Sequence, residues 1–359
     1  MFVLPLPLGY LAAMAIWSIV LGGAFYGLLR ARQICRWKAP RRLWLVNAGL
    51  SLAMLLAVVT ASELGFACFA DFSDTFNITN VSKRWLTLHL DREQNNEGFR
   101  DRNPFTKYVS PGQKRIVFLG DSFTAGHGIK KIDDRFTDRI AAWLEQQTPG
   151  KYVVANLGEP GLEASMIEAR AKGLFLTHSD VSIIVYIYVL NDIEGYDERT
   201  KQALGQIYTA EPKFPLLRDT YLINWLYFRY VQFKYAKGTS YYSSLAEAYR
   251  SEPWVGLRAK LAQLRRECAE EHVDFRMVIF PFMQDMGEDL FHDARVKLHD
   301  FCKAEKVPLL DLEPVFRKHA GENFTVSRFD AHPNERAHAI AAEAIEKDLL
   351  YDLVRPAKP

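Results

Sequence analysis

The strongest constraint on the fold is an uninterrupted apolar run at residues 116–119, which is followed by Gly120, Asp121 and Ser122. Such a run of β-formers predicts a strand that is buried on both faces of a parallel sheet. In open α/β sheets, ligands bind where the strands end, because the turns there present side chains to a crevice. Ser122 is therefore a candidate nucleophile. The alternative is an ordinary strand-to-helix turn, in which Gly provides the bend and Ser caps the helix.

Strand and helix patterns alternate from residue 113 onward, which is typical of a parallel sheet covered by helices. The third strand is apolar throughout and is expected at the centre of the sheet. We therefore predict one doubly wound α/β domain over residues 113–355, with an insertion at 195–253. The expected strands are 116–119, 153–157, 182–190, 275–280 and 308–312, and the expected helices are 134–147, 164–176, 258–272, 290–306 and 335–350.

Two long uncharged segments precede this domain, at residues 4–29 and 43–62. Each reaches the ~20 residues that cross a bilayer, although the second could also be a buried helix of a soluble protein. The loop between them, residues 30–42, has six basic and no acidic residues. The positive-inside rule places such a loop in the cytoplasm. We therefore expect residues 1–69 to be a two-pass anchor. The N-terminus and the later domain would then be extracytoplasmic, as in a bacterial inner-membrane protein that faces the periplasm.

The region that connects anchor and domain, residues 70–112, has weak periodicity and a polar middle at 91–103. It is expected to be an arm that packs on the first strand of the domain, or else a flexible tether.

Charge and cysteine content bear on the partners of the domain. Setting aside the six basic residues of the loop leaves 39 of the 45 Lys and Arg residues, against 43 Asp and Glu residues. This balance does not give the basic surface that nucleic-acid binding requires.

Cys268 and Cys302 lie in the expected domain, where they could form a disulfide or remain two buried thiols. No His or Cys spacing indicates a zinc site, and no glycine loop indicates phosphate binding, so we expect no metal and no cofactor.

Polar residues that could complete a serine hydrolase site follow later strands or precede the last helix. The amide of Asn191, after the third strand, could donate to a developing oxyanion or cap a helix. Gly161, after the second strand, could offer a bare backbone N–H or make a plain turn. His332, on an expected loop, could be a general base oriented by Asp330 or a solvated histidine. His338 is expected on the final helix, in a structural role.

The expected insertion contains a dense aromatic segment at residues 221–235. Its rings could stack on sugars, lie in the membrane interface or pack on the domain. Its aromatic residues are Tyr221, Trp225, Tyr227, Phe228, Tyr230, Phe233 and Tyr235.

The order of these signals resembles that of the SGNH, or GDSL-like, hydrolase family over residues 114–350. The matching segments are Gly120-Asp121-Ser122, Gly161, Asn191-Asp192 and Asp330-Ala331-His332-Pro333, and Gly98-Phe99-Arg100 resembles bacterial members. The resemblance implies a flavodoxin-like sheet and ester hydrolysis. It also implies that Ser122 is the nucleophile, His332 the base and Asp330 its acid, with an oxyanion hole made by the N–H of Ser122, Gly161 and Asn191.

Two positions depart from the family pattern. Val189 stands where the family has a glycine two residues before Asn191, and Asp330 lies two residues before His332 instead of the more usual three.

The expected function is therefore extracytoplasmic hydrolysis of an acyl ester, with acetyl as the expected acyl group, on an acetylated polysaccharide or a lipid. An O-acyltransferase would use the same acyl-enzyme with a sugar hydroxyl as acceptor. A non-catalytic glycan-binding or assembly protein is the alternative of another class.

Overall fold

The computed structural model describes residues 5–105, 109–177, 180–236, 241–283 and 290–355. The chain forms two compact units. The smaller comprises Met1–Phe72, Ile78–Arg84 and Ala210–Phe233, and the larger comprises Ser73–Asn77, Trp85–Thr209 and Lys234–Pro359.

The larger unit is built on a five-stranded parallel sheet with the strand order β2-β1-β3-β4-β5. The strands are β1 (Lys114–Gly120), β2 (Tyr152–Gly158), β3 (Val181–Val189), β4 (Asp274–Phe280) and β5 (Leu309–Asp311). β3 is central and its residues 183–189 are all buried, because both faces of the sheet are covered. The predicted flavodoxin-like sheet and its central third strand are confirmed.

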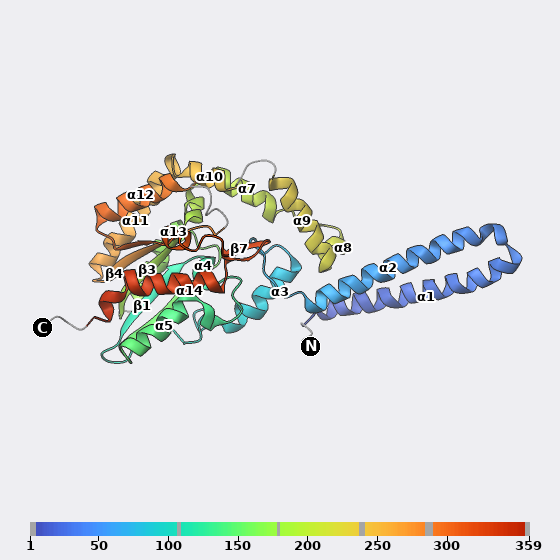
Figure 1. The fold of residues 1–359 in the computed structure, drawn as a ribbon, viewed down its shortest axis with the longest axis horizontal. Helices are drawn as coiled ribbons and strands as arrows, with labels where there is room; N and C mark the ends of the chain where they lie inside the picture. The colour runs from blue at the N-terminus through green and yellow to red at the C-terminus, as the bar shows by residue number, and fades with distance from the viewer. Residues whose placement is uncertain (1–4, 106–108, 178–179, 237–240, 284–289, 356–359) are drawn as a thin grey trace. The chain divides into compact units, whose positions relative to one another are not determined.

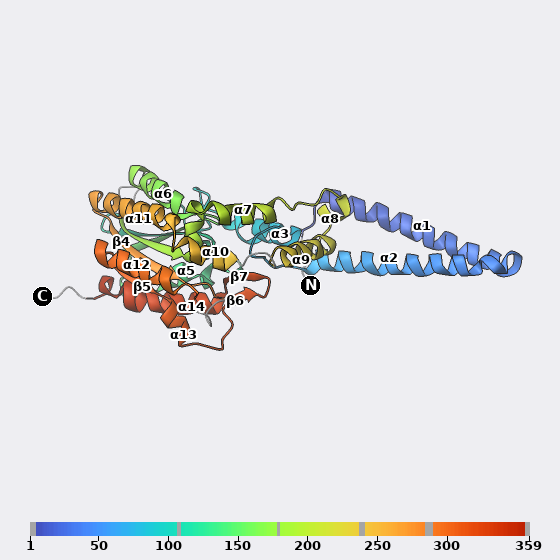
Figure 2. The ribbon, with the colours of Figure 1, turned by 90° about the horizontal axis from the view of Figure 1, so that it is seen from above.

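Helices cover both faces of this sheet (Figures 1 and 2). α5 and α14 pack together on one face, and α6 and α11 pack together on the other. This arrangement follows from right-handed crossovers between parallel strands. The helices of this unit are α4 (Ser122–Ala125), α5 (Phe136–Gln147), α6 (Ala164–Thr177), α7 (Glu198–Tyr208), α10 (Tyr241–Ala248), α11 (Glu252–Glu270), α12 (His292–Glu305), α13 (Glu313–Arg317) and α14 (Glu335–Ala344), and α3 (Asn80–His89) is shared with the smaller unit.

Two helix boundaries of the larger unit differ from the prediction by more than two residues. α11 begins at Glu252, six residues earlier than expected, with Pro253 in its first turn, where the missing N–H is tolerated. The final helix changes at Ile345 into a π-helical turn, Ile345–Leu349, so its regular part is shorter than predicted.

Residues 330–333 are a strand and not the loop predicted from the sequence. β7 (Asp330–Pro333) pairs antiparallel with β6 (Thr325–Ser327), and all four residues of β7 are buried. β6 has three residues and β7 has four. These lengths are at or below the lower limit of the 4–8 residues over which a strand pattern can be recognised, which explains why the sequence did not reveal them.

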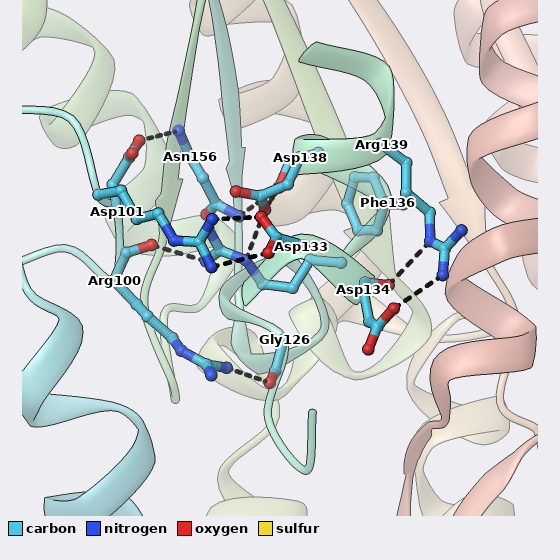
Figure 3. Close-up of polar contacts among 12 residues, drawn as sticks. Arg100, Asp101, Gly126, Asp133, Asp134, Phe136, Asp138, Arg139 and Asn156 are labelled. Carbon is cyan, nitrogen blue, oxygen red and sulfur yellow. Dashed lines mark hydrogen bonds and ion pairs between the residues drawn. The ribbon is translucent and has the colours of Figure 1, made fainter. Parts of the chain in front are cut away.

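The segment at residues 93–105 packs within the larger unit. It is therefore a packed arm and not the flexible tether that was the alternative. Phe105 is buried and lies 4.4 Å from the Arg115 guanidinium on β1. The Arg100 guanidinium is also buried and donates to the Gly126 carbonyl at 2.9 Å, and Asp101 accepts from the Asn156 N–H at 3.1 Å (Figure 3). The arm therefore holds the segment that follows α4.

Cys268 on α11 and Cys302 on α12 are both buried free thiols, which excludes a disulfide between them in this structure. Burial raises the pKa of each thiol to about 12. Neither thiol has the thiolate character that reactivity requires.

The smaller unit contains two helices that are long and apolar enough to cross a membrane, α1 (Leu8–Lys38) and α2 (Leu43–Phe69). Their 31 and 27 residues give lengths of roughly 46 and 40 Å at 1.5 Å per residue. Both exceed the ~30 Å hydrocarbon core of a bilayer. α8 (Pro215–Arg218) and most of α9 (Leu222–Ala236) belong to the same unit.

The close approach of β2 to α4 generates a prediction about stability. A Cβ atom on Gly158 would lie 2.2 Å from the Ala125 backbone nitrogen. We expect Gly158→Ala to destabilise the protein by about 1–3 kcal/mol through overpacking and to lower the thermal midpoint. The control is Gly173→Ala, on an exposed part of α6 where a Cβ meets nothing within 4 Å. That change should be neutral or stabilising by about 0.5–1 kcal/mol. Equal midpoints for the two variants would contradict the account.

Candidate active site

Ser122 lies at the carboxyl end of β1, as predicted. The Asp121 side chain caps the short helix α4 by accepting from the Phe123 N–H at 2.9 Å. Gly126 ends α4 in the left-handed region, with φ of 73°. The amide of Asn156, on β2, donates to the Thr124 carbonyl at 2.7 Å. Ser122 is therefore held in place by contacts of α4 with β1 and β2. Ser122 remains partly exposed.

A chain of hydrogen bonds joins Ser122, His332 and Asp330. His332 Nε2 lies 2.9 Å from Ser122 Oγ, and His332 Nδ1 lies 2.6 Å from Asp330 Oδ1. The last two residues are on β7, so its pairing with β6 fixes their backbone. The structure therefore brings together three of the residues singled out in the sequence, although Ser122 and His332 lie 210 positions apart.

The Asp330 carboxylate is fully buried and hydrogen-bonded at both oxygens. Oδ1 also accepts from the His332 backbone N–H at 3.1 Å, and Oδ2 accepts from the Ser73 hydroxyl. Burial alone would raise the pKa of Asp330, but His332, His127 and Ser73 together hold that pKa well below its usual range. Asp330 therefore stays ionised, and its charge favours a proton on His332 Nδ1.

Ser73 is a site residue that the sequence did not reveal. It begins a segment that follows α2 by a few residues and pairs with β7. Thr75 N–H donates to the Phe329 carbonyl at 3.2 Å, and Thr75 Oγ1 accepts from the Ala331 N–H at 3.0 Å. A serine 257 positions before its partner, in a region of weak periodicity, carries no local signal.

His127 is a second residue that was missed. Its ring stacks on that of His332, with centroids 4.1 Å apart, and it packs on Trp85 at 5.3 Å. Burial, and then the proximity of His332, lower the pKa of His127 to about 3. His127 is therefore a neutral ring that buttresses His332. The sequence feature that could have singled out His127 was its position five residues after Ser122, between Gly126 and Gly128.

Gly161 and Asn191 lie beyond the ends of β2 and β3. The loop that leads to Gly161 is tied to β1, because the Glu159 N–H donates to the Gly120 carbonyl at 3.0 Å. Gly161 has φ of 81°, and a Cβ there would enter open space. Asn191 lies close enough to Asp121 to stabilise its negative charge. The oxyanion roles of Gly161 and Asn191 remain predictions.

Asp121, which directly precedes Ser122, carries a perturbed carboxyl group. Burial raises its pKa to about 6, against the opposing effects of the Phe123 N–H, His332 and Asn191. The site therefore contains one carboxyl group that is held ionised and one whose burial favours the neutral acid.

His127, Asp330 and His332 are also the one group among the described residues with the proximity of a metal-ligand set. Both ring nitrogens of His332 are already hydrogen-bonded, to Ser122 and to Asp330. A metal could bind His332 only by displacing one of these contacts, so the geometry suits proton transfer better.

His338 lies on α14 and has a structural environment, in agreement with the sequence interpretation. Its Nδ1 accepts from the Phe136 N–H at 3.2 Å, and its ring stacks on Phe136. Burial and nearby arginines lower its pKa to about 3.

The fold and the chemistry of the site define a serine hydrolase that acts on esters. A model of the GDSL-like Lipase/Acylhydrolase family matches residues 118–340, which is more than half of the chain. The protein therefore belongs to this family. No curated protein matches the chain.

Solved structures resemble the chain at low sequence identity. A member of the lipolytic protein G-D-S-L family from Veillonella parvula is 14% identical, with 66% of this chain and 98% of that chain covered and a TM-score of 0.40. An esterase, EstA, from Pseudoalteromonas sp. is 10% identical, with coverages of 68% and 100% and a TM-score of 0.42. A catalytic mutant of an acetylxylan esterase from Geobacillus stearothermophilus is 14% identical, with coverages of 70% and 100% and a TM-score of 0.43.

The buried His338 predicts a specific pH dependence of stability. Its pKa is about 3 in the folded chain and ~6.5 when unfolded, so acid favours the unfolded state as the pH falls below ~6.5. Relative to His338→Gln, the wild type should lose about 1.4 kcal/mol per pH unit. Thermal unfolding at pH 7.5 and pH 5 measures this difference. The exposed His272, whose φ is positive, provides the control His272→Asn, which should track the wild type. A difference between wild type and His338→Gln that does not change with pH would contradict the account.

Proposed function

We propose that the protein is a membrane-anchored extracytoplasmic esterase in which Ser122, His332 and Asp330 form the catalytic triad. The observation that carries this proposal is the hydrogen-bond chain from Ser122 Oγ through His332 to Asp330, with separations of 2.9 and 2.6 Å. These distances lie within the range for proton transfer between a nucleophile and its base.

In the first half of the reaction, His332 Nε2 removes the hydroxyl proton while Ser122 Oγ attacks the ester carbonyl carbon. Asp330 keeps the proton on Nδ1 and stabilises the imidazolium. The backbone N–H groups of Ser122 and Gly161 and the Asn191 amide would bind the oxyanion. The C–O bond to the alcohol then breaks, and the alcohol leaves with the proton from His332.

Water completes the reaction. It loses a proton to His332 Nε2 and attacks the acyl-enzyme, after which Ser122 recovers its proton and the acyl group leaves as a carboxylic acid.

The location is part of the proposal. α1 and α2 would span the membrane as residues 1–69, and the basic loop at 30–42 would be cytoplasmic. The arm at 70–112 and the hydrolase domain at 113–355, with its insertion at 195–253, would then face the periplasm of a bacterium. The bilayer is the expected partner, and an acetyl ester on an extracytoplasmic polysaccharide or a lipid is the proposed substrate.

Labelling by a fluorophosphonate probe tests the triad. Detergent-solubilised wild type should be labelled, and Ser122→Ala should not. His332→Ala should be labelled on the order of 10²–10⁴-fold more slowly, because the general base is lost. His299→Ala, which removes an exposed histidine, should behave as wild type. Equal labelling of wild type and Ser122→Ala would overturn the assignment, and release of acetate compared with longer acids from ester substrates would test the acyl group.

Ser73 supplies a second prediction, as a positioning residue that acts through Asp330. The change Ser73→Ala removes the donor to a fully buried oxygen, and hydrogen bonds to charged groups contribute ~1.5–3 kcal/mol. The Ser73 hydroxyl stabilises the Asp330 carboxylate more when His332 is neutral than when a His332 imidazolium already offsets the charge of that carboxylate. Losing this hydroxyl should therefore move the acid limb of the pH profile to higher pH. Because Asp330 also loses a contact that fixes its orientation towards His332, we expect kcat/KM above that limb to fall about tenfold or more, with little change in KM.

The matched control for Ser73 is Ser110→Ala, which changes an exposed serine and should leave the profile unchanged. A pH profile of Ser73→Ala that overlays the wild type would remove Ser73 from the site. A lower rate at every pH without a shift would indicate a merely structural role.

A further inference from the structure

α9 has apolar residues on two opposite faces, although a surface helix normally has only one apolar stripe. One face is buried: Phe228 and Val231 are 3% and 5% exposed, and the polar Asn224 on the same face is 2% exposed. On the other face, Leu226 and Tyr230 are 51% and 64% exposed, and Phe233 follows at the same helical spacing. We call residues 226, 230 and 233 the α9 stripe. The α9 stripe contains Tyr230 and Phe233 from the aromatic segment at 221–235. Tyr221 and Phe228 of the same segment are buried. The side chain of Tyr235 lies outside the described residues.

The first turn of α9 is fixed to the end of α2 by Glu63. The carboxylate of Glu63 accepts from the backbone N–H groups of Tyr221 and Leu222 at 2.6 and 2.8 Å, and the Tyr10 hydroxyl donates to it at 3.0 Å. These bonds satisfy N–H groups that a helix leaves unpaired at its start. Because Glu63 is 2% exposed and is held from α1, α2 and α9, the three helices are joined at this point.

Further contacts fix the segment that leads into α9. The Asn80 amide donates to the carbonyls of Arg218 and Thr220, each at 2.7 Å. The Arg84 guanidinium donates to the carbonyl of Ala67 at 2.6 Å and lies 4.4 Å from the centre of the Tyr221 ring. α8 and α9 are therefore built onto the α1–α2 hairpin, at the end opposite the basic loop.

We propose that α8 and α9 are an interfacial part of the membrane anchor, and that the α9 stripe lies among the lipid headgroups and upper acyl chains of the outer leaflet. This inference rests on the proposed spanning of the membrane by α1 and α2. Tyr10 is the third residue of α1 and Glu63 lies near the end of α2, so the junction is at the depth where one end of the spanning hairpin leaves the bilayer. Amphipathic aromatic side chains are favoured at this depth.

Features of the stripe favour lipid over the other occupants considered from the sequence. The stripe belongs to the unit that contains the hairpin, so its residues are fixed relative to the two helices that would span the bilayer. Phe214 and Leu216, at the start of α8, are 63% and 51% exposed and extend the apolar surface of the same unit. The hairpin of this unit also has exposed apolar residues, which would face lipid.

Nitroxide accessibility in lipid nanodiscs tests the proposal on the full chain. Cys35→Ser and Cys68→Ser remove the two partly exposed thiols, and the buried Cys268 and Cys302 remain. A spin label is then attached after Leu226→Cys or, separately, Tyr230→Cys. The collision rate of the spin label with oxygen, which concentrates in the bilayer, is then compared with its collision rate with a water-soluble nickel complex. Thermal unfolding of each labelled protein verifies that it is folded.

Two reference positions make the outcomes distinct. Leu52→Cys places the label on an exposed part of α2, and Val255→Cys places it on an exposed part of α11. We expect the stripe labels to favour oxygen over nickel, as at Leu52 and unlike Val255. Stripe labels that resemble Val255, while Leu52 favours oxygen, would overturn this inference and leave the anchor intact. Stripe labels shielded from both reagents would also overturn it, in favour of a protein cover such as a second copy. Nickel access at Leu52 itself would refute the spanning helices.

Discussion

The hydrogen bond between Ser122 Oγ and His332 Nε2 is the contact on which the proposed chemistry of this protein depends. It requires a residue after the first strand of the sheet and a residue just before the last helix to meet within 2.9 Å. Each partner is held from several sides. α4 is fixed by β1 and by the Asn156 amide on β2, while His332 is held by the pairing of β7 with β6, by the ring of His127 and by Asp330. A nucleophile and base that are held in this way need little reorganisation when the substrate arrives.

A buried carboxylate is costly unless its oxygens are hydrogen-bonded, and Asp330 meets that requirement with donors from distant parts of the sequence. His332 supplies its ring and backbone N–H groups to one oxygen, and Ser73 supplies a hydroxyl to the other. Ser73 and Thr75 follow α2 in the chain and pair with the segment that contains Asp330. The residues just after the N-terminal helices therefore belong to the candidate active site, and the region at 70–112 is more than a connection between two parts of the protein.

The sequence predicted the parts of this structure that depend on local patterns. Continuous apolar runs identified the buried strands. The end of the first strand and the Asp-x-His pattern singled out Ser122, Asp330 and His332 as candidates, and the structure brings these three residues together. Contacts between distant residues were not predictable in the same way. Ser73 has no local signal, β6 and β7 are too short for periodicity to reveal, and residues 210–233 looked like a simple insertion although they pack with the N-terminal helices. A contact that depends on where two remote segments meet leaves little trace in either segment alone.

The central claim is that Ser122 is acylated in a site whose oxyanion donors are Ser122 N–H, Gly161 N–H and the Asn191 amide. A crystal structure of the protein after reaction with a phosphonate inhibitor tests it most directly. The account predicts phosphorus bonded to Ser122 Oγ, with the phosphoryl oxygen about 2.7–3.1 Å from these three donors. Phosphorus bonded to another residue, or a phosphoryl oxygen that faces away from Gly161 and Asn191, would contradict it.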